Sequence, residues 1–350
     1  MAQTMQVPLG CDMHVHLRQG NLMQMVTPLI SGGGVGTVFV MPNLQPPIKT
    51  TDDALQYKAQ LEALNPKVKY LMSLYLSPEL TPEEIRKAAK AGIVGVKSYP
   101  RGVTTNSDSG IESYEAYYPV FEAMQEVGMV LNLHGEIPSD HDNGICVLNA
   151  EEKFLVHLTK LHTRFPKLRM VLEHATTQAA VERVKELGDT VACTITAHHL
   201  ELVVDDWAGF AHHFCKPVAK YPHDRQALRD VIKQGHPRFF LGSDSAPHPK
   251  DRKEAMGNLP CAAGVFTTPY LLPYIATLFE NLGCLDRLAD FTSSNGAKFY
   301  QLDNSSGGFV TLMRQEHDIP DEIHYVDENS SGRSVVPYKA GKSLTWKIIS

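Results

Sequence analysis

The stretch GCDMHVHLRQG, residues 10–20, joins an apolar start to two histidines and an arginine, and it introduces the pattern on which the fold depends. Side chains at positions i and i+2 of a β-strand point to the same face. His14 and His16 can therefore reach one point from a single strand. That geometry suits a metal ion, although a pair of hydrogen-bonded structural histidines would have the same spacing.

Similar apolar or β-branched runs recur along the chain, with helical patterns between them. The eight runs are VPLGCDMH (7–14), TVFVMPN (37–43), KYLMSLYL (69–76), IVGVKSY (93–99), MVLNLHG (129–135), LRMVLEH (168–174), DTVACTITAH (189–198) and PRFFLGSD (237–244). In the segment 77–92, Thr81 and Glu84 have the spacing of a capping box, which predicts a helix. Near-continuous apolar strands that alternate with helices indicate a parallel sheet buried on both faces. Eight such units predict a closed (β/α)8 TIM barrel of the α/β class.

Polar side chains stand at the carboxyl ends of most runs. They are His14, His16, Asn43, Lys97, His134, His174 and Asp244. In a TIM barrel the catalytic groups occupy these strand ends, because the loops that follow the strands form one shared mouth. A doubly wound open sheet would also explain the alternation of strands and helices, but it explains the polar strand ends less economically.

The pattern changes beyond about residue 304, where GGFVTLMRQE (307–316), IPDEIHYVDE (319–328) and KSLTWKIIS (342–350) look like short strands. We therefore expect a barrel over residues 1–304 and a small C-terminal extension, residues 305–350, packed on it. The segment 255–279 contains no charged residue, but prolines and glycines interrupt it. A loop followed by a buried helix is expected there, and not a membrane span.

The composition is that of an ordinary globular chain, with 43% hydrophobic and 21% charged residues in 350. A net charge of −6 without a basic run argues against a nucleic-acid partner. Six cysteines occur without C-x-x-C spacing, which is typical of a reducing compartment. The first ten residues lack the features of a secretory signal, so a cytoplasmic location is expected.

Four histidines and one aspartate at the ends of the first, fifth, sixth and eighth runs supply nitrogen and oxygen ligands suited to zinc. They are His14, His16, His134, His174 and Asp244. Taken singly, each histidine could be a hydrogen-bonded core or loop residue, and the aspartate could cap a helix. Together they favour a hydrolytic metal site, since a structural zinc would include cysteine ligands.

Lys97 ends the fourth run and is the unexpected member, because an ammonium ion beside metal cations is disfavoured. Near cations and partly buried, its pKa would fall, and the neutral amine could react with carbon dioxide. The resulting carbamate is an anion whose two oxygens can bridge two metals. A lysine that reaches solvent is the simpler alternative when the neighbouring ligands are ignored.

Six motifs, in this order along the chain, resemble those of the amidohydrolase superfamily and, within it, the short, single-function dihydroorotase family of bacteria and fungi. They are DMHVHLR (12–18), VMPN (40–43), GVKSYPRGVTTNS (95–107), LNLHGE (131–136), LEHATT (172–177) and GSDSAPH (242–248). The resemblance covers roughly residues 8–300. It implies the reversible cyclisation of N-carbamoyl-L-aspartate, a small-molecule substrate, to L-dihydroorotate in pyrimidine synthesis, and it makes a homodimer plausible.

The resemblance also implies two zinc ions per chain, bridged by carboxylated Lys97 and a hydroxide. One ion would be held by His14, His16, Lys97 and Asp244, and the other by Lys97, His134 and His174. Asp244 would be the general acid and base.

The same resemblance implies the residues that bind substrate. Arg18, Asn43 and His248 match positions that hold the substrate carboxylate, Ala263 matches a backbone contact to the ring, and Thr104 and Thr105 match a mobile lid. Each of these could instead be an ordinary surface or turn residue.

Two rival functions remain open on the sequence alone, namely another cyclic amidohydrolase, such as a hydantoinase or allantoinase, and a non-catalytic scaffold of dihydroorotase descent. The carboxylate-binding positions argue against the first, and the complete ligand set argues against the second. His198 and His199 end the seventh run, but the resemblance assigns them no metal, and a hydrogen-bonding role is expected for both.

Overall fold

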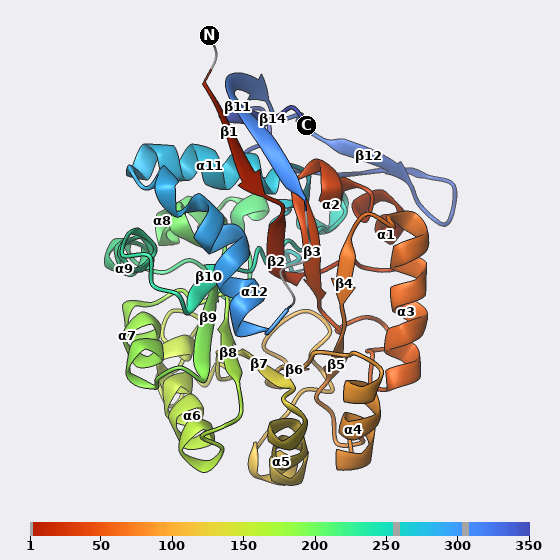
Figure 1. Cartoon of the computed structure of the whole chain (residues 1–350), viewed down its shortest axis with the longest axis vertical. Coiled ribbons are helices and arrows are strands. Elements are labelled where there is room, and N and C mark those ends of the chain that lie inside the picture. Colours follow the sequence, from red (N-terminus) through yellow and green to blue (C-terminus); the bar gives the residue numbers. More distant parts are fainter. Residues whose placement is uncertain (1–2, 255–259, 303–307) are drawn as a thin grey trace.

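The computed structural model describes residues 3–254, 260–302 and 308–350. Its centre is a barrel of parallel strands with helices around the outside (Figure 1). The barrel strands are β2 (Gly10–Val15), β3 (Val35–Val40), β4 (Lys69–Leu71), β5 (Ser73–Tyr75), β6 (Gly95–Ser98), β7 (Val130–His134), β8 (Met170–Glu173), β9 (Val191–Ile195) and β10 (Phe239–Leu241). Both β4 and β5 fall in the predicted run 69–76, so the eight runs account for all of these strands. The TIM-barrel prediction is confirmed.

The barrel closes between its first and last strands close to the mouth. The strands pair in parallel in the orders β2–β3–β4 and β5–β6–β7–β8–β9–β10. The backbone N–H of Asp244 donates to the His14 carbonyl over 2.9 Å, and that of His16 donates to the Ser245 carbonyl over 3.0 Å. Residues more than 200 positions apart in the chain thereby become neighbours.

Helices connect and cover the strands. They are α1 (Gly20–Val26), α2 (Leu29–Gly32), α3 (Thr51–Leu64), α4 (Pro82–Lys90), α5 (Tyr118–Val127), α6 (Ala150–Arg164), α7 (Gln178–Glu186), α8 (Val204–Trp207), α9 (Pro222–Lys233), α10 (Lys250–Lys253), α11 (Leu271–Leu282) and α12 (Asn295–Phe299), with short turns η1 (Glu115–Tyr117), η2 (His198–Leu200), η3 (Ala211–His213), η4 (Thr268–Tyr270), η5 (Leu285–Arg287) and η6 (Asp290–Ser294).

The predicted capping box at the start of α4 forms only in part. The Thr81 hydroxyl accepts from the backbone N–H of Glu84 over 3.2 Å, as expected of an N-cap. The Glu84 carboxylate, however, accepts from the backbone N–H and the hydroxyl of Thr51, each over 2.6 Å. Glu84 therefore joins α4 to the start of α3, a tertiary contact that displaces the local one.

A second, antiparallel sheet lies beside the barrel (Figure 1). In this sheet β11 (Phe309–Asp318) pairs with both β1 (Thr4–Pro8) and β14 (Ser343–Ile348). The strands β12 (Ile323–Val326) and β13 (Gly332–Val335) form a separate two-stranded hairpin. The first run is thus divided, since Val7 and Pro8 belong to this sheet and β2 starts at Gly10. Proline has no N–H for a strand ladder, which suits a strand end.

The predicted boundary between the barrel and the C-terminal extension, at residue 304, lies outside the described residues and stays a prediction.

The uncharged segment forms a buried helix, as predicted. Residues Leu271–Phe279 of α11 are all buried. The part of the predicted loop at 255–259 lies outside the described residues. Within the described ranges, no helix combines the length and the apolar character needed to cross a membrane.

Candidate metal centre

Three of the predicted ligands converge at the seam where the barrel closes. His14 lies in β2, His16 follows it, and Asp244 lies beyond the end of β10. The Asp244 Oδ1 atom is 3.3 Å from His14 Nε2 and 3.0 Å from His16 Nε2. Their ligand atoms all lie within 4.8 Å of one another, so one cation could be held by all three.

His134 and His174 extend this cluster from β7 and from the residue after β8. The ring centroids of His134 and His174 are 4.7 Å apart, and those of His174 and His14 are 4.9 Å apart. The Nδ1 atom of His174 is buried and has no hydrogen-bond partner among the described residues. A buried ring nitrogen of this kind is available to a metal ion.

Lys97 lies in β6 and is fully buried. Within the described parts of the chain its Nζ atom has no hydrogen-bond partner, and it lies 5.2 Å from the centroid of the Tyr99 ring. The Tyr99 and His134 ring centroids are 6.3 Å apart. Burial lowers the pKa of Lys97 to about 8, although Glu173 and Asp244 oppose that shift. The alternative in which the Lys97 side chain reaches solvent is therefore wrong.

Two buried carboxylates that the sequence analysis overlooked orient the histidines from behind. Glu173 Oε2 lies 2.8 Å from His14 Nδ1, and Glu136 Oε2 lies 2.8 Å from His134 Nε2. Metal-binding histidines commonly donate their other ring N–H to a carboxylate, which fixes the tautomer and the ring orientation. The available signal was a carboxylate inside or just after an apolar run.

Asp12 is a third overlooked carboxylate, and it fastens the barrel seam. It accepts from the backbone N–H of Ser243 over 2.7 Å and from the Ser243 hydroxyl over 2.5 Å, and also from the backbone N–H of His14 over 3.2 Å. Burial raises the pKa of Asp12 to about 6, against the effect of these hydrogen bonds. Asp12 therefore holds the strand that carries His14 next to the segment that carries Asp244.

The protonation states of four of the five side chains suit a metal, whereas the pKa of His14 is raised, because the carboxylates of Glu173 and Asp244 outweigh its burial. Burial lowers the pKa of His16 to about 4, and burial also lowers the pKa values of His134 and His174. Burial would raise the pKa of Asp244, but hydrogen bonds from His14 and His16 outweigh it and hold that pKa well below its usual value. Metal ligands must be neutral imidazoles and ionised carboxylates.

Three of the seven non-glycine residues with a positive φ angle in the described parts of the chain lie at this site. Arg18, His174 and Asp244 adopt positive φ angles of 63°, 40° and 46°. Left-handed backbone costs a non-glycine residue of the order of 1 kcal/mol, and such residues cluster at functional sites. The strain turns the strand ends so that these side chains face the mouth.

The predicted substrate-binding residues Arg18, His248 and Ala263 form one contact group. Arg18 Nε donates to the Pro247 carbonyl over 3.0 Å. The Nε2 atom of His248 lies 3.1 Å from Arg18 Nη2 and 2.9 Å from the Ala263 carbonyl oxygen. A single ring nitrogen cannot accept from the guanidinium and donate to the carbonyl at once, so only one of these contacts is a hydrogen bond. Part of the guanidinium therefore stays available to another acceptor.

The segment that carries Thr104 and Thr105 is anchored on the end of β3. Asn43 Nδ2 donates to the Thr105 carbonyl over 3.0 Å, and Asn106 Nδ2 donates to the Asn43 carbonyl over 2.9 Å. Thr104 bonds with Ser107 inside the loop through its backbone N–H and carbonyl. Thr105 is thus brought next to Asn43, as a segment folded over the mouth requires.

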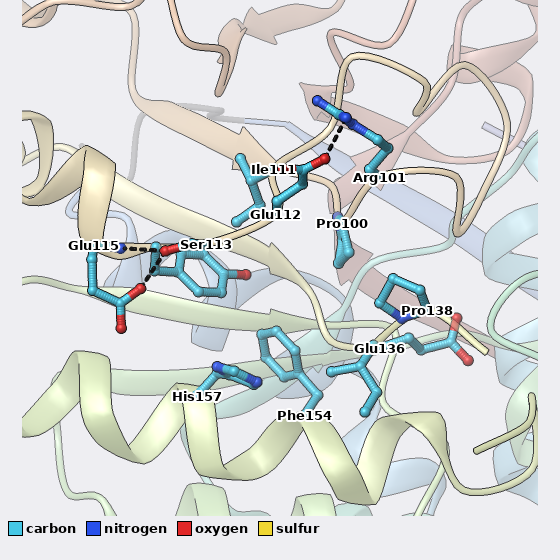
Figure 2. Close-up of a pocket in the computed structure, with 12 residues that line it drawn as sticks. Pro100, Arg101, Ile111, Glu112, Ser113, Glu115, Glu136, Pro138, Phe154 and His157 are labelled. Atoms are coloured by element: carbon cyan, nitrogen blue, oxygen red, sulfur yellow. Dashed lines mark hydrogen bonds and ion pairs between the residues drawn. The ribbon is translucent and has the colours of Figure 1, made fainter. Parts of the chain in front are cut away.

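A separate pocket of about 310 Å³ lies between the loop 100–115 and α6 (Figure 2). Pro100, Ile111, Pro138 and Phe154 contribute apolar side chains to its wall, and Glu136 lies at its edge. Of the residues that the structure describes, none of the predicted metal ligands or substrate-binding residues lines it. Glu136 therefore links the wall of this pocket to the metal centre through its contact with His134.

Known proteins that are similar to this chain match it over almost its whole length. The amidohydrolase family matches residues 7–309. A dihydroorotase of Mycosarcoma maydis is 54% identical, with 99% of both chains covered, and a probable dihydroorotase of Schizosaccharomyces pombe is 51% identical, with 98% of both covered. The crystal structure of Saccharomyces cerevisiae dihydroorotase in complex with 5-fluoroorotic acid superposes with a TM-score of 0.94 at 45% identity, covering 99% of this chain and 98% of that one.

Proposed function

The chain belongs to the amidohydrolase family, with dihydroorotases as its relatives, and on that premise we propose that His14, His16 and Asp244 mark the place where it interconverts N-carbamoyl-L-aspartate and L-dihydroorotate. It is a metal-dependent cyclic amidohydrolase that opens or closes a six-membered ring. The observation that supports this location best is the convergence of these three side chains, within 4.8 Å, at the barrel mouth.

The residues present fit two divalent cations, which we assign as zinc. His14, His16 and Asp244 would hold one, and His134 and His174 would hold the other. Histidine nitrogen and carboxylate oxygen are ligands that zinc prefers, and the absence of thiolate from this set is typical of catalytic zinc. When bound, two such ions polarise the substrate carbonyl and make a water molecule more acidic.

Lys97 would bridge the two cations as a carbamate. The ammonium ion would first lose a proton; the neutral amine would then form the N–C bond with carbon dioxide as one C=O π bond breaks, and a second N–H proton would leave to solvent, so that a cation becomes an anion. Its pKa of about 8 leaves an appreciable neutral fraction for this reaction near neutral pH. Its burial beside three imidazoles supports the proposal, since an anion is compatible with bound metals and an ammonium ion is not.

Asp244 would move the proton. In hydrolysis it would take a proton from the attacking water and deliver it to the ring nitrogen as the C–N bond breaks. In cyclisation it would take the ureido proton as that nitrogen attacks the carboxyl carbon, and pass it to the oxygen that leaves as water. Its depressed pKa keeps the carboxylate ionised and ready to accept.

Arg18, with Asn43 and His248, would bind the free carboxylate that both substrate forms carry. A guanidinium can donate two parallel hydrogen bonds to a carboxylate. The Ala263 backbone would meet the ring, and Thr104 and Thr105 would close over it. Because a hydantoin ring lacks this carboxylate, the clamp would separate the two kinds of cyclic amide.

The direct test follows the absorbance of L-dihydroorotate with purified, zinc-loaded protein and with a chelated sample. Turnover should stop on chelation and return when zinc is restored. Turnover that persists after metal analysis shows both ions removed would contradict the assignment of the centre.

We infer from the resemblance also that two chains form a homodimer and that the enzyme works in the cytoplasm. All six cysteines lie in described parts of the chain and are free thiols, which supports a reducing compartment. Light scattering coupled to gel filtration would measure the assembly.

A further inference from the structure

A second cluster of potential ligands lies just beyond the end of β9 and includes none of the side chains assigned above, and nothing in the proposed reaction uses it. His198 and His199 lie in η2, just after β9, and Cys215 follows η3. All three side chains are buried, with exposures of 0%, 1% and 1%. One ligand atom from each lies within 4.8 Å of the others, so the cluster meets the distance requirement for a single cation.

The geometry of the two best-defined ligands suits zinc. Cys215 Sγ lies 3.5 Å from His199 Nε2. In a tetrahedral site with bonds of about 2.3 Å to sulfur and about 2.1 Å to nitrogen, these two atoms stand roughly 3.6 Å apart. The Pro217 carbonyl oxygen lies 3.0 Å from His199 Nε2 and 3.2 Å from Cys215 Sγ, so an oxygen is also at hand.

His198 gives independent evidence that an ion binds at this cluster. It is completely buried, and neither of its ring nitrogens has a hydrogen-bond partner in the described ranges. Buried polar groups in native proteins are nearly always satisfied, so an imidazole with two unsatisfied nitrogens calls for a partner. The hydrogen-bonding role expected from the sequence is found for His199 only.

The surrounding charges permit a cation here. Lys253 and Lys220 are the nearest ammonium groups, and both are already engaged. Lys253 Nζ donates to the carbonyls of Phe214, Ala262 and Gly264, and Lys220 Nζ donates to the Val218 carbonyl. Burial raises the pKa of the Cys215 thiol, so its proton would leave only when a cation binds the sulfur.

We propose that His198, His199 and Cys215 bind a further divalent cation, zinc by its ligand chemistry, which shares no ligand with the catalytic centre. Binding forms a metal–sulfur bond and releases the thiol proton to solvent, and it moves the His199 ring proton from Nε2, which now donates to the Pro217 carbonyl, to Nδ1. The ion would tie the end of β9 to the segment between η3 and Pro217, and its role would be structural.

Cobalt substitution tests this proposal in the whole protein. A thiolate bound to Co²⁺ gives an intense near-ultraviolet charge-transfer band, and none of the ligands assigned to the catalytic centre is a cysteine. A band that depends on Cys215 therefore reports the new site, whether or not the catalytic assignment holds. The chelated chain, titrated with Co²⁺, should develop the band and bind one equivalent beyond those of the catalytic centre.

Cys215→Ser should abolish the band, and His198→Gln, which keeps the thiol, should weaken cobalt binding at this site more than tenfold. Cys284→Ser, at a buried cysteine that belongs to neither cluster of potential ligands, is the matched control and should keep the band. Absence of the band from the unmodified protein, or its survival in Cys215→Ser, would overturn the proposal. If Cys215→Ser fails to fold, unchanged cobalt affinity in His198→Gln would overturn it instead.

Discussion

Two histidine clusters lie near the ends of the barrel strands, and they differ in what holds their rings. In the catalytic cluster, carboxylates lie behind the imidazoles, with Glu173 on His14 and Glu136 on His134. In the second cluster, His199 contacts a backbone carbonyl and the Cys215 thiol, and the described residues offer His198 no partner.

This difference indicates how each cluster would bind a metal ion. A carboxylate behind the ring fixes one tautomer and raises ligand basicity, which prepares a site before the ion arrives. A ring without such support is positioned by packing alone, and the ion itself must complete the arrangement. We therefore expect the first cluster to control turnover and the second to control mainly stability.

Removing Asp244 should have the largest effect, because the catalytic cluster then loses both a ligand and its proton carrier. Asp244→Ala should reduce turnover in both directions by 10³-fold or more, while circular dichroism shows the fold retained. Near-normal kinetics in this variant would refute the assigned acid and base.

Lys97→Ala should lower turnover by about two orders of magnitude and leave one metal ion at the catalytic centre, since the bridging anion is gone. Metal analysis by mass spectrometry is the measurement. Carbon-13 NMR of the unmodified protein in labelled bicarbonate should show a carbamate signal that Lys97→Ala lacks. Two ions at the catalytic centre of the variant would show that no bridge is needed.

Glu173→Gln tests whether the supporting carboxylate matters. Glu173 accepts from His14, Asn132 and Thr194, so an amide nitrogen would face at least one donor. Metal affinity should fall by about 10–100-fold. Glu151→Gln is the control, because Glu151 is equally buried and accepts from Thr176 and Thr177 without touching a proposed ligand. Equal losses in both variants would mean that the effect is one of general stability.

Arg18→Lys separates substrate binding from the metal centre. A lysine keeps the charge but loses the two-pronged donor geometry, so KM for L-dihydroorotate should rise by about tenfold with metal content unchanged. Steady-state kinetics with metal analysis measures both quantities. An unchanged KM would remove Arg18 from the carboxylate clamp.

The smallest effect is expected at the second cluster. Saturating zinc should raise the Tm of the unmodified protein more than that of Cys215→Ser, by about 1–2 °C for each kcal/mol of binding free energy lost. Differential scanning calorimetry with Cys284→Ser as the control measures the difference. If zinc raised the Tm of Cys215→Ser as much as that of the unmodified protein, the second cluster would not stabilise the fold by binding zinc, and the proposed difference between the two clusters would be wrong.

Much of the fold could be predicted because its signals are local. The eight runs coincide with the barrel strands, and the strand-end residues lie where the pattern placed them, since the two-residue period of a strand and the strand–helix alternation depend only on nearby positions. The division of the first run between β1 and β2 could not be predicted, because β1 pairs with β11, some 300 residues away.

The sequence by itself determined the class of barrel and the polar side chains that stand at its strand ends. Only the tertiary structure decided that Glu173, Glu136 and Asp12 support these side chains, and that His198 is left without a partner among the described residues. The reason is physical: a hydrogen bond depends on the separation of two atoms in space. Barrel closure sets that separation between residues as distant as Asp12 and Ser243, whereas local sequence sets only the direction in which each side chain leaves its own strand.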